Sequence, residues 1–289
     1  MRRSNNTPRR FLISVLLSAT VLWGRPVHAQ QELSYTGELG FSIGAAHYFG
    51  DLNPDFHLNA PKPSVGIYYR RYMNDYIGVR AQLRFMQLGY SDVNNKQNEY
   101  DYRRNLSFNT NIEEFSLQGD FNFFRFEPGS LAYRFSPYLT GGLALFHFDP
   151  YAYLDGRKYY LQPLHTEGQG SALYPDRKPY GLISAAFLIG GGFKYNVSKK
   201  VNVGMECLYR FAQTDYLDDV STTYAATSVF PPNKDGSPSV AYRLQDRSSA
   251  LGNAISYPGR QRGNSRDKDQ YLTLEFTISI LFTSYHCRF

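Results

Sequence analysis

The sequence contains few of the features that usually indicate chemistry or a helical membrane protein. Only two of its 289 residues are cysteines, which is too few for a disulfide framework. None of its six histidines is spaced from another histidine or a cysteine as metal ligands are, and Gly190-Gly191-Gly192 precedes no helix start, as a phosphate-binding loop would. After the N-terminal segment, no run reaches the 18 or so apolar residues that a spanning helix needs. We therefore expect no metal, no cofactor and no helical membrane span.

The N-terminal segment has the three-part pattern of a secretory signal. Residues 1–10 carry four arginines and no acid, residues 11–23 form an apolar run, and Val27-His28-Ala29 offers small residues for cleavage before Gln30. The apolar run is too short to cross a bilayer core of about 30 Å, which argues against a membrane anchor. We expect residues 1–29 to be a cleaved signal peptide and residues 30–289 to be the mature protein.

The basic charge of the chain belongs largely to this leader. The leader holds five arginines and no acid, so its removal lowers the formal net charge from +6 to +1. Binding to nucleic acid requires a clustered basic footprint, which the mature chain then lacks. We expect no nucleic-acid partner.

The dominant pattern in the mature chain is an alternation of apolar and polar residues. Residues 271–282 show it best. Successive side chains of a strand point to opposite faces, so this segment would have one apolar face and one largely polar face. One face of that segment holds Leu272, Leu274, Phe276, Ile278, Ile280 and Phe282. The other face holds Tyr271, Thr273, Glu275, Thr277 and Ser279. The same pattern predicts eight strands, at residues 34–49, 64–73, 76–90, 112–126, 136–148, 181–196, 200–214 and 270–283.

The connections between these strands alternate between short and long. The long ones are residues 50–63, 91–111, 149–180 and 215–269. Short turns on one side and long loops on the other are typical of outer-membrane barrels, whereas a soluble β-sandwich, the alternative, would not sort its turns by length. An open sheet in lipid would leave edge groups unpaired, so the sheet must close. We expect an all-β, eight-stranded antiparallel transmembrane barrel in the outer membrane of a Gram-negative bacterium, with periplasmic turns, extracellular loops and both termini periplasmic.

The face that would line the barrel carries charges of both signs. An eight-stranded barrel has an interior only wide enough for its own side chains, so we expect ion pairs that plug it, with a conducting pore or proton path as the alternative. The predicted lumen network consists of Glu38, Arg70, Arg80, Arg84, Glu114, Asp120, Lys194, Glu206, Arg210 and Glu275.

Catalysis has little support in the sequence. Asp215, Asp218 and Asp219 cluster at the start of the largest loop and His165 lies in another loop, so an outer-membrane hydrolase is one alternative. Paired acids at a loop start are more often solvated or bind a cation loosely. We interpret these three as loop anchors together with Arg260, Arg262 and Arg266 of the same connection. We expect no catalytic residue and no enzyme.

The two cysteines are expected to lie apart. Cys207 falls on the apolar side of a strand, whereas Cys287 follows the last strand in a short tail, residues 284–289. An unpaired thiol in the oxidising periplasm can form a disulfide with a partner. An intermolecular disulfide through Cys287 is one interpretation, and a free or shielded thiol is the other.

Several stretches resemble one family. They are Tyr48-Phe49-Gly50-Asp51-Leu52-Asn53-Pro54, Asp215-Tyr216-Leu217-Asp218-Asp219-Val220-Ser221, Arg262-Gly263-Asn264, Asp269-Gln270-Tyr271 and Cys287-Arg288-Phe289. Together they resemble the PorG-like outer-membrane proteins of the type IX secretion system of Bacteroidota, over residues 34–289. The second stretch is the most specific, and Arg288 departs from the proline that often follows the cysteine in similar proteins.

The resemblance implies a non-enzymatic part of a protein secretion machine. Such proteins lie in outer-membrane lipid and associate with a periplasmic ring built from a PorK-like lipoprotein and a PorN-like protein. It also implies a docking surface at the periplasmic turns and tail, with Tyr285, Cys287 and Phe289 as partner-binding residues. The alternative is a stand-alone barrel, structural, adhesive or a narrow channel.

Overall fold

The computed structural model describes residues 37–130 and 132–282. The expected signal peptide, the first residues of the first predicted strand, and the tail residues Tyr285, Cys287 and Phe289 lie outside the described residues. Within the described ranges, no helix has the length and apolar character needed to cross a bilayer.

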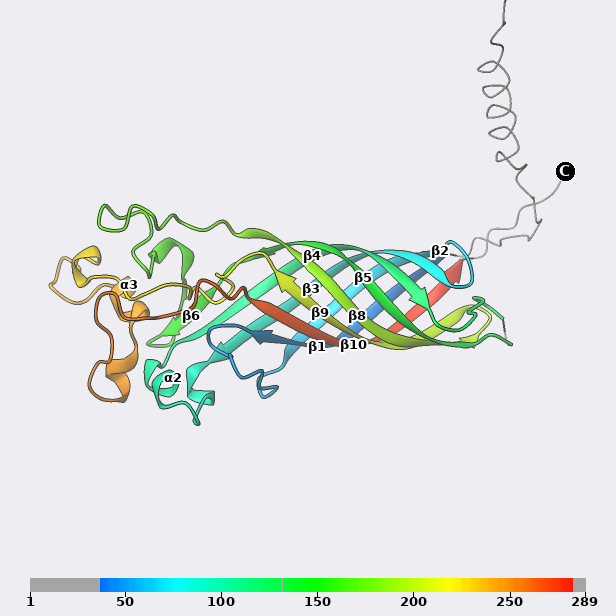
Figure 1. Ribbon diagram of the computed structural model, residues 1–289, viewed down its shortest axis with the longest axis horizontal. Helices are drawn as coiled ribbons and strands as arrows, with labels where there is room; N and C mark the ends of the chain where they lie inside the picture. Colours follow the sequence, from blue (N-terminus) through cyan, green and yellow to red (C-terminus); the bar gives the residue numbers. More distant parts are fainter. Residues whose placement is uncertain (1–36, 131, 283–289) are drawn as a thin grey trace, which may run out of the picture. The chain divides into compact units, whose positions relative to one another are not determined.

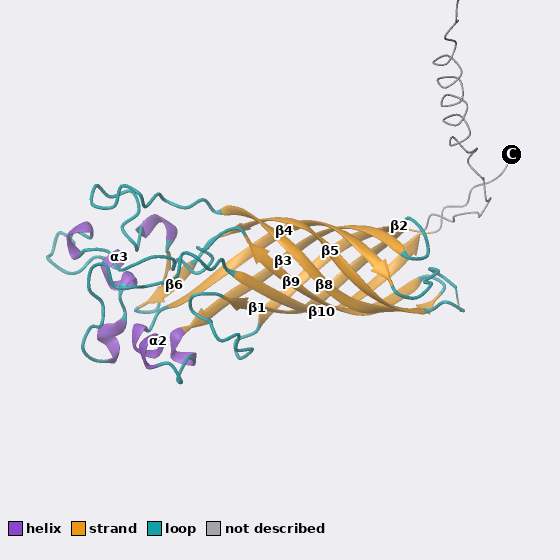
Figure 2. Ribbon diagram, in the orientation of Figure 1, coloured by secondary structure: helices purple, strands orange, loops and turns teal. Residues whose placement is uncertain are grey.

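Eight long strands form one antiparallel sheet that closes on itself (Figures 1 and 2). Each strand pairs with its neighbour in the chain, and the first strand pairs with the last. The predicted closed eight-stranded barrel is confirmed. Its strands are β1 (Gly37–Phe49), β2 (Lys62–Tyr72), β3 (Ile77–Ser91), β4 (Ser107–Asn122), β5 (Phe135–Phe148), β8 (Ile183–Ser198), β9 (Val201–Ala212) and β10 (Gln270–Phe282).

The seam between the first and last strands is continuous. The register of β1 against β10 runs without a break from the pair Gly37–Phe282 to the pair Phe49–Gln270. No edge of the barrel wall is therefore left with unpaired backbone groups, which is the condition for a sheet to cross a bilayer.

The wall has an apolar outside and a polar inside, as the alternation predicts. On β10, Phe276, Ile278 and Ile280 are exposed, whereas Glu275 and Ser279 are buried. The other strands show the same split, and their outward faces form a belt of exposed apolar side chains about nine to eleven residues tall, the height that tilted spanning strands need. Buried polar atoms and exposed hydrophobic side chains invert the arrangement of a soluble protein, so this surface is that of a membrane-spanning barrel.

The long connections all lie at one end of the barrel and the short turns at the other (Figure 1). Strand β1 begins and strand β10 ends at the short-turn end. The long connections together make up a loop cap, which we define as residues 50–61, 92–106, 149–182 and 213–269. The cap contains α2 (Glu99–Arg104), α3 (Val240–Gln245), and short 3-10 turns at Asp92–Asn94, Gln162–Leu164, Thr227–Val229 and Ser248–Leu251.

Two features of the cap differ from the sequence prediction. A hairpin of β6 (Tyr151–Leu154) and β7 (Arg157–Tyr160) occupies the connection that was predicted as loop. Its turn residues Asp155 and Gly156 both have positive φ, at 51° and 76°, which is the tight hairpin turn that an Asp-Gly pair favours. Strand β4 also starts at Ser107, five residues earlier than predicted, because residues 107–111 pair with the end of β3 beyond the apolar belt.

The assignment of side chains to the lipid-facing and lumen-facing sides of the wall predicts how a charge placed in the wall changes the stability of the barrel. Ile278 lies near the middle of β10 and is 51% exposed. The substitution Ile278→Arg should lower the free energy of unfolding by about 2–4 kcal/mol, because it places a charge in lipid near the midplane. Ile278→Leu, which keeps the apolar volume, should cost less than about 1.5 kcal/mol. Urea unfolding in lipid vesicles measures both, and equal losses would contradict the assignment.

Candidate functional site

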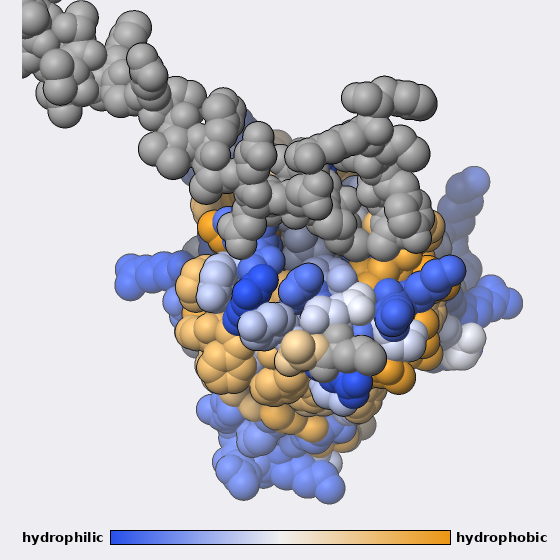
Figure 3. Space-filling view, turned by 90° about the vertical axis from the view of Figure 1, so that its right-hand side faces the viewer, coloured by the Kyte–Doolittle hydropathy of each residue, from blue (hydrophilic) through white to orange (hydrophobic). Residues whose placement is uncertain are grey.

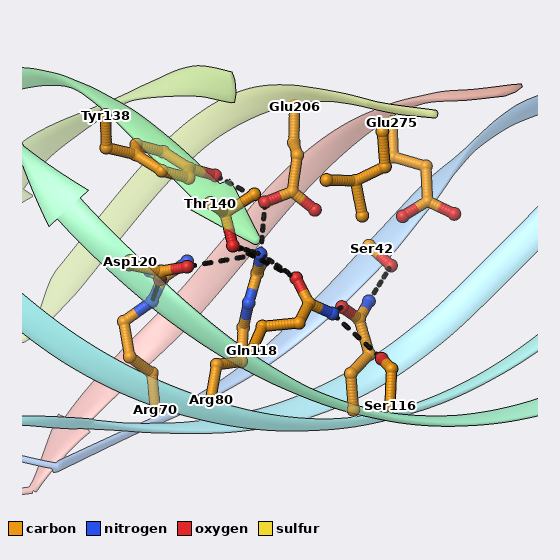
Figure 4. A network of polar contacts seen from close by, with 12 residues as sticks. Ser42, Arg70, Arg80, Ser116, Gln118, Asp120, Tyr138, Thr140, Glu206 and Glu275 are labelled. Atoms are coloured by element: carbon orange, nitrogen blue, oxygen red, sulfur yellow. Dashed lines mark hydrogen bonds and ion pairs between the residues drawn. The ribbon is translucent and has the colours of Figure 1, made fainter. Parts of the chain in front are cut away.

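The interior of the barrel contains a continuous network of buried polar and charged side chains (Figure 4). All ten residues of the predicted lumen network are buried, each no more than 3% exposed. The structure brings these residues, which come from seven strands, into contact along the barrel axis.

Near the short-turn end, arginines bridge acids of different strands. Arg70 on β2 contacts Glu38 on β1 and places its Nε 2.5 Å from Oδ2 of Asp120 on β4. The Nη2 atom of Arg80 lies 2.5 Å from Oε2 of Glu206 and 3.5 Å from Oδ1 of Asp120. Asp120 is thus shared by two guanidinium groups, and the network crosses the barrel from β1 to β9.

The same arrangement continues toward the loop cap. Arg84 on β3 lies 2.6 Å from Glu114 on β4 and 2.9 Å from Glu275 on β10. The second oxygen of Glu114 lies 2.6 Å from Nε of Arg210 on β9 and accepts a hydrogen bond from the Tyr271 hydroxyl. Breaking such a pair would leave an uncompensated buried charge, so each residue depends on its partners.

Uncharged side chains fill the space between the ion pairs. Gln118 accepts a hydrogen bond from Arg80, and its amide donates to Ser116 (Figure 4). Tyr138 donates to Glu206, and the Lys194 ammonium lies 5.1 Å from the Tyr138 ring centre and 4.7 Å from that of Tyr72. Eight strands leave an interior that side chains can fill completely. The arrangement is that of a plug.

A second polar cluster joins the loop cap to the end of the barrel. We call it the cap junction and define it as Tyr48, Asp51, Arg104, Glu167, Asp215, Asp218, Asp219, Arg262 and Asp269. The members come from the end of β1, from the connection that follows it, from α2 and from the two longest connections, so residues far apart in the sequence meet here.

Tyr48 is the point where the barrel wall meets the cap. Its hydroxyl oxygen lies 2.5 Å from Oδ2 of Asp218 and 2.9 Å from Oδ1 of Asp269, and all three residues are buried. A tyrosine hydroxyl carries one hydrogen, so it can donate to only one of the two carboxyl groups. A second full hydrogen bond at this oxygen forms when the other acid carries a proton and donates it. The geometry therefore favours a proton on one of the two acids, Asp218 or Asp269.

Two buried arginines hold the remaining segments of the cap. Arg262 lies 3.0 Å from Glu167, donates to the Asp219 carbonyl oxygen at 2.5 Å and lies 3.7 Å from the Asp219 carboxylate. Arg104 pairs with Asp92 at 2.7 Å and donates to the backbone carbonyl oxygens of Asp51 and Arg262. Glu167 in turn accepts from the backbone N–H groups of residues 221 and 222. These bonds tie the cap segments to one another.

The segments approach so closely that one glycine has no room for a side chain. A Cβ atom on Gly263 would lie 2.3 Å from the Asp51 carboxylate and 2.6 Å from the Ser221 backbone nitrogen. The next residue, Asn264, donates its backbone N–H to both Asp51 oxygens at 2.9 Å. The Arg262-Gly263-Asn264 stretch is therefore fitted to the segments around residues 51 and 221.

Burial without enough cations raises the pKa of the junction acids. Burial raises the pKa of Asp51 to about 6 and that of Asp215 to about 7. Burial, reinforced by the neighbouring carboxylates, raises the pKa values of Asp218 and Asp269 well above their usual range. Burial also raises the pKa of Asp219 to about 6, although Arg262 opposes the shift. These directions agree with the proton that the Tyr48 contacts favour on Asp218 or Asp269.

The predicted loop anchors Asp215, Asp218 and Asp219 all lie in the cap junction. Within the described part of the chain, no hydrogen bond joins Asp218 or Asp219 to His165, because Asp218 faces Tyr48 and Asp219 faces Thr166, Tyr180 and Arg262. Glu167 and Arg104 were missed by the sequence analysis, since each lies in an irregular connection without a pattern. Of the other two arginines proposed to anchor the loop, Arg260 donates to the Ile255 carbonyl oxygen and Arg266 is exposed.

Cys207 lies on the outer, lipid-facing side of β9, where its side chain is exposed. Its register partners are Gly191 on β8 and Leu274 on β10. The interpretation of Cys287 as a disulfide partner stays a prediction.

The cap junction should respond to pH. The raised pKa values mean that the closed cap holds protons that an opened cap releases, so closure is most stable near pH 4 and weakens as pH rises through about 6 and 7. Hydrogen exchange of the amides of residues 215–222, corrected for the intrinsic rate at each pH, should show falling protection between pH 5 and 8. Asp218→Asn, which keeps a hydrogen-bond donor, should flatten this dependence. Protection that rises with pH would refute the retention of protons by the acids of the closed cap.

Among solved structures, small outer-membrane barrels are similar to this chain. The attachment invasion locus protein Ail of Yersinia pestis shows 8% identity and a TM-score of 0.40, covering 86% of this chain and 100% of its own. Neisserial surface protein A shows 12% identity and a TM-score of 0.39, covering 85% and 97%. OprG of Pseudomonas aeruginosa shows 11% identity and a TM-score of 0.37, covering 86% and 96%. Because these identities and TM-scores are low, the assignment of the fold depends on the strand pairing described above.

No curated protein matches this sequence. A family model described as a domain of unknown function, DUF6089, matches residues 25–230. That range contains seven of the eight barrel strands and most of the cap junction. Because the match covers well over half of the chain, this protein belongs to the DUF6089 family.

Proposed function

We propose that the protein is a non-enzymatic outer-membrane barrel that conducts no solute. The closed barrel would hold the loop cap on one side of the membrane and the short-turn rim on the other. The observation that carries this proposal is the lumen, where four buried arginines pair with five buried acids across the barrel and Lys194 packs against tyrosine rings. An interior filled in this way leaves no route for a solute. The parts available to other molecules are then the cap surface and the short-turn rim.

The closed lumen predicts that the protein conducts no ions. In a planar lipid bilayer the wild-type barrel should show no current steps. The double variant Arg80→Ser and Glu206→Ser removes the 2.5 Å ion pair and leaves space for water, so it should show steps. The pair Arg125→Ser and Glu127→Ser, at the exposed turn between β4 and β5, is the control and should stay silent. Regular steps from the wild type would identify a channel instead.

A more specific role is supported by the resemblance to PorG-like proteins. The stretches around residues 48, 218, 262 and 269, which carry that resemblance, come together in the cap junction although they are up to 221 residues apart. Similarity gathered in one structural unit favours common descent over chance matches. On this basis we infer a component of the type IX secretion system, in which the short-turn end faces the periplasm and docks a ring of PorK-like and PorN-like proteins.

Affinity purification from the outer membrane distinguishes the secretion role from a stand-alone barrel. Tagged full-length protein should retain the PorK-like and PorN-like proteins after detergent extraction. Cys287→Ser should remove any band of higher mass on non-reducing gels, whereas Cys207→Ser, which changes a thiol on the lipid face, should not. Purification without ring proteins, together with normal cargo export after deletion of the gene, would favour a stand-alone structural or adhesive barrel.

A further inference from the structure

The rim at the short-turn end contains a pocket that neither the barrel nor its proposed anchoring role requires. Figure 3 looks onto this end, where hydrophilic side chains of the turns lie among hydrophobic side chains of the wall. The pocket has a volume of about 530 Å³, and we call it the rim pocket. It is lined by Tyr76, Phe123, Phe124, Arg125, Ala132, Tyr133, Arg134 and Phe135.

The pocket combines aromatic side chains with two arginines at the level where the apolar belt ends. Phe123, Phe124 and Phe135 are about half exposed and continue the outer face of β4 and β5. Phe124 and Phe135 lie 6.4 Å apart between ring centres. Aromatic side chains at this height mark the boundary between hydrocarbon and water in outer-membrane barrels. One wall of the pocket therefore meets acyl chains, and the other meets the polar boundary.

Arg125 is held in place by its neighbours on two turns. Its Nε lies 2.9 Å from the Asp75 carboxylate on the turn between β2 and β3, and its Nη2 lies 3.6 Å from the Glu127 carboxylate. Its guanidinium carbon lies 4.4 Å from the Tyr133 ring centre. A guanidinium group has five N–H donors, so these contacts leave Arg125 able to donate further hydrogen bonds. Its side chain is 40% exposed, which keeps those donors accessible.

Arg134 contributes the second positive charge to the same pocket. Its Nη1 lies 3.5 Å from the Tyr195 hydroxyl on β8, which fixes the side chain near the rim. The backbone on either side of the pocket is also held. The Asn196 N–H donates to the Arg134 carbonyl oxygen, and the Phe126 N–H donates to the Asp75 carbonyl oxygen. Planar guanidinium groups match the oxygens of a phosphate group.

We propose that the rim pocket binds one phospholipid, with its phosphate against Arg125 and Arg134 and its acyl chains along Phe123, Phe124 and Phe135. The remaining N–H donors of Arg125, together with the Arg134 guanidinium, can meet the phosphate oxygens, and the apolar wall is continuous with the belt that already lies in lipid. The proposal rests on the membrane-spanning barrel but not on the absence of conductance or on the secretion partners, so those tests can fail independently of this one.

Native mass spectrometry of the full-length protein in detergent tests the proposal. The wild type should retain dioleoylphosphatidylglycerol at least about fivefold better than dioleoylglycerol, which has the same acyl chains and no phosphate. The double variant Arg125→Gln and Arg134→Gln should lose most of this preference. The control Arg157→Gln and Lys178→Gln removes two exposed charges from the loop cap and should keep it.

The comparison of the two lipids uses the unaltered protein, so it remains decisive even if the double variant does not fold. Equal retention of the two lipids would overturn the proposal, because it would show that only the acyl chains are recognised. Displacement of the phospholipid by millimolar inorganic phosphate would also overturn it, since the site would then bind a free anion. Retention of the full preference in a folded double variant would place the lipid elsewhere on the barrel.

Discussion

The structure depends on the requirement that charges inside a narrow barrel be paired. Eight strands give an interior with no space for bulk water, so an isolated ion there would be strongly destabilising. The chain meets this requirement with arginines that each contact acids on other strands, as Arg84 does with Glu114 and Glu275. The polar lumen and the apolar outer wall together produce the alternating sequence. The ion pairs therefore account for both the strand pattern and the closed interior.

The two polar clusters balance their charge in different ways. Among the described residues, the buried acids of the lumen are Glu38, Glu114, Asp120, Glu206 and Glu275, and the buried basic residues there are Arg70, Arg80, Arg84, Lys194 and Arg210. In the loop cap, seven buried acids face only two buried basic residues: Asp92, Asp101, Glu167, Asp215, Asp218, Asp219 and Asp269, against Arg104 and Arg262. The lumen matches five acids with five basic residues. The cap has fewer cations than acids, so burial raises the pKa values of its acids, and this makes the cap sensitive to pH.

The barrel could be predicted from the sequence because a wall between lipid and a polar lumen imposes a period of two on every strand. The cap could not, because its structure depends on contacts between residues that are distant in the chain. The hydroxyl of Tyr48, for example, meets Asp218 and Asp269 across 170 and 221 residues. Glu167 and Arg104 belong to no periodic segment. The β6–β7 hairpin did leave a local signal, the Asp155-Gly156 turn, but its strands have only four residues each.

The resemblance to PorG-like proteins falls on residues that fold the cap onto the barrel. Its most specific stretch, residues 215–221, contributes Asp218 and Asp219 to the cap junction, where both are buried. Residues needed to close the cap are constrained by folding, whatever the protein contacts outside. Their similarity fits the common descent proposed above through a shared barrel and cap. A docking partner can meet only exposed surfaces, so the proposed secretion role places its specificity at the short-turn rim and the outer face of the cap, where the sequence is free to differ between barrels with different partners.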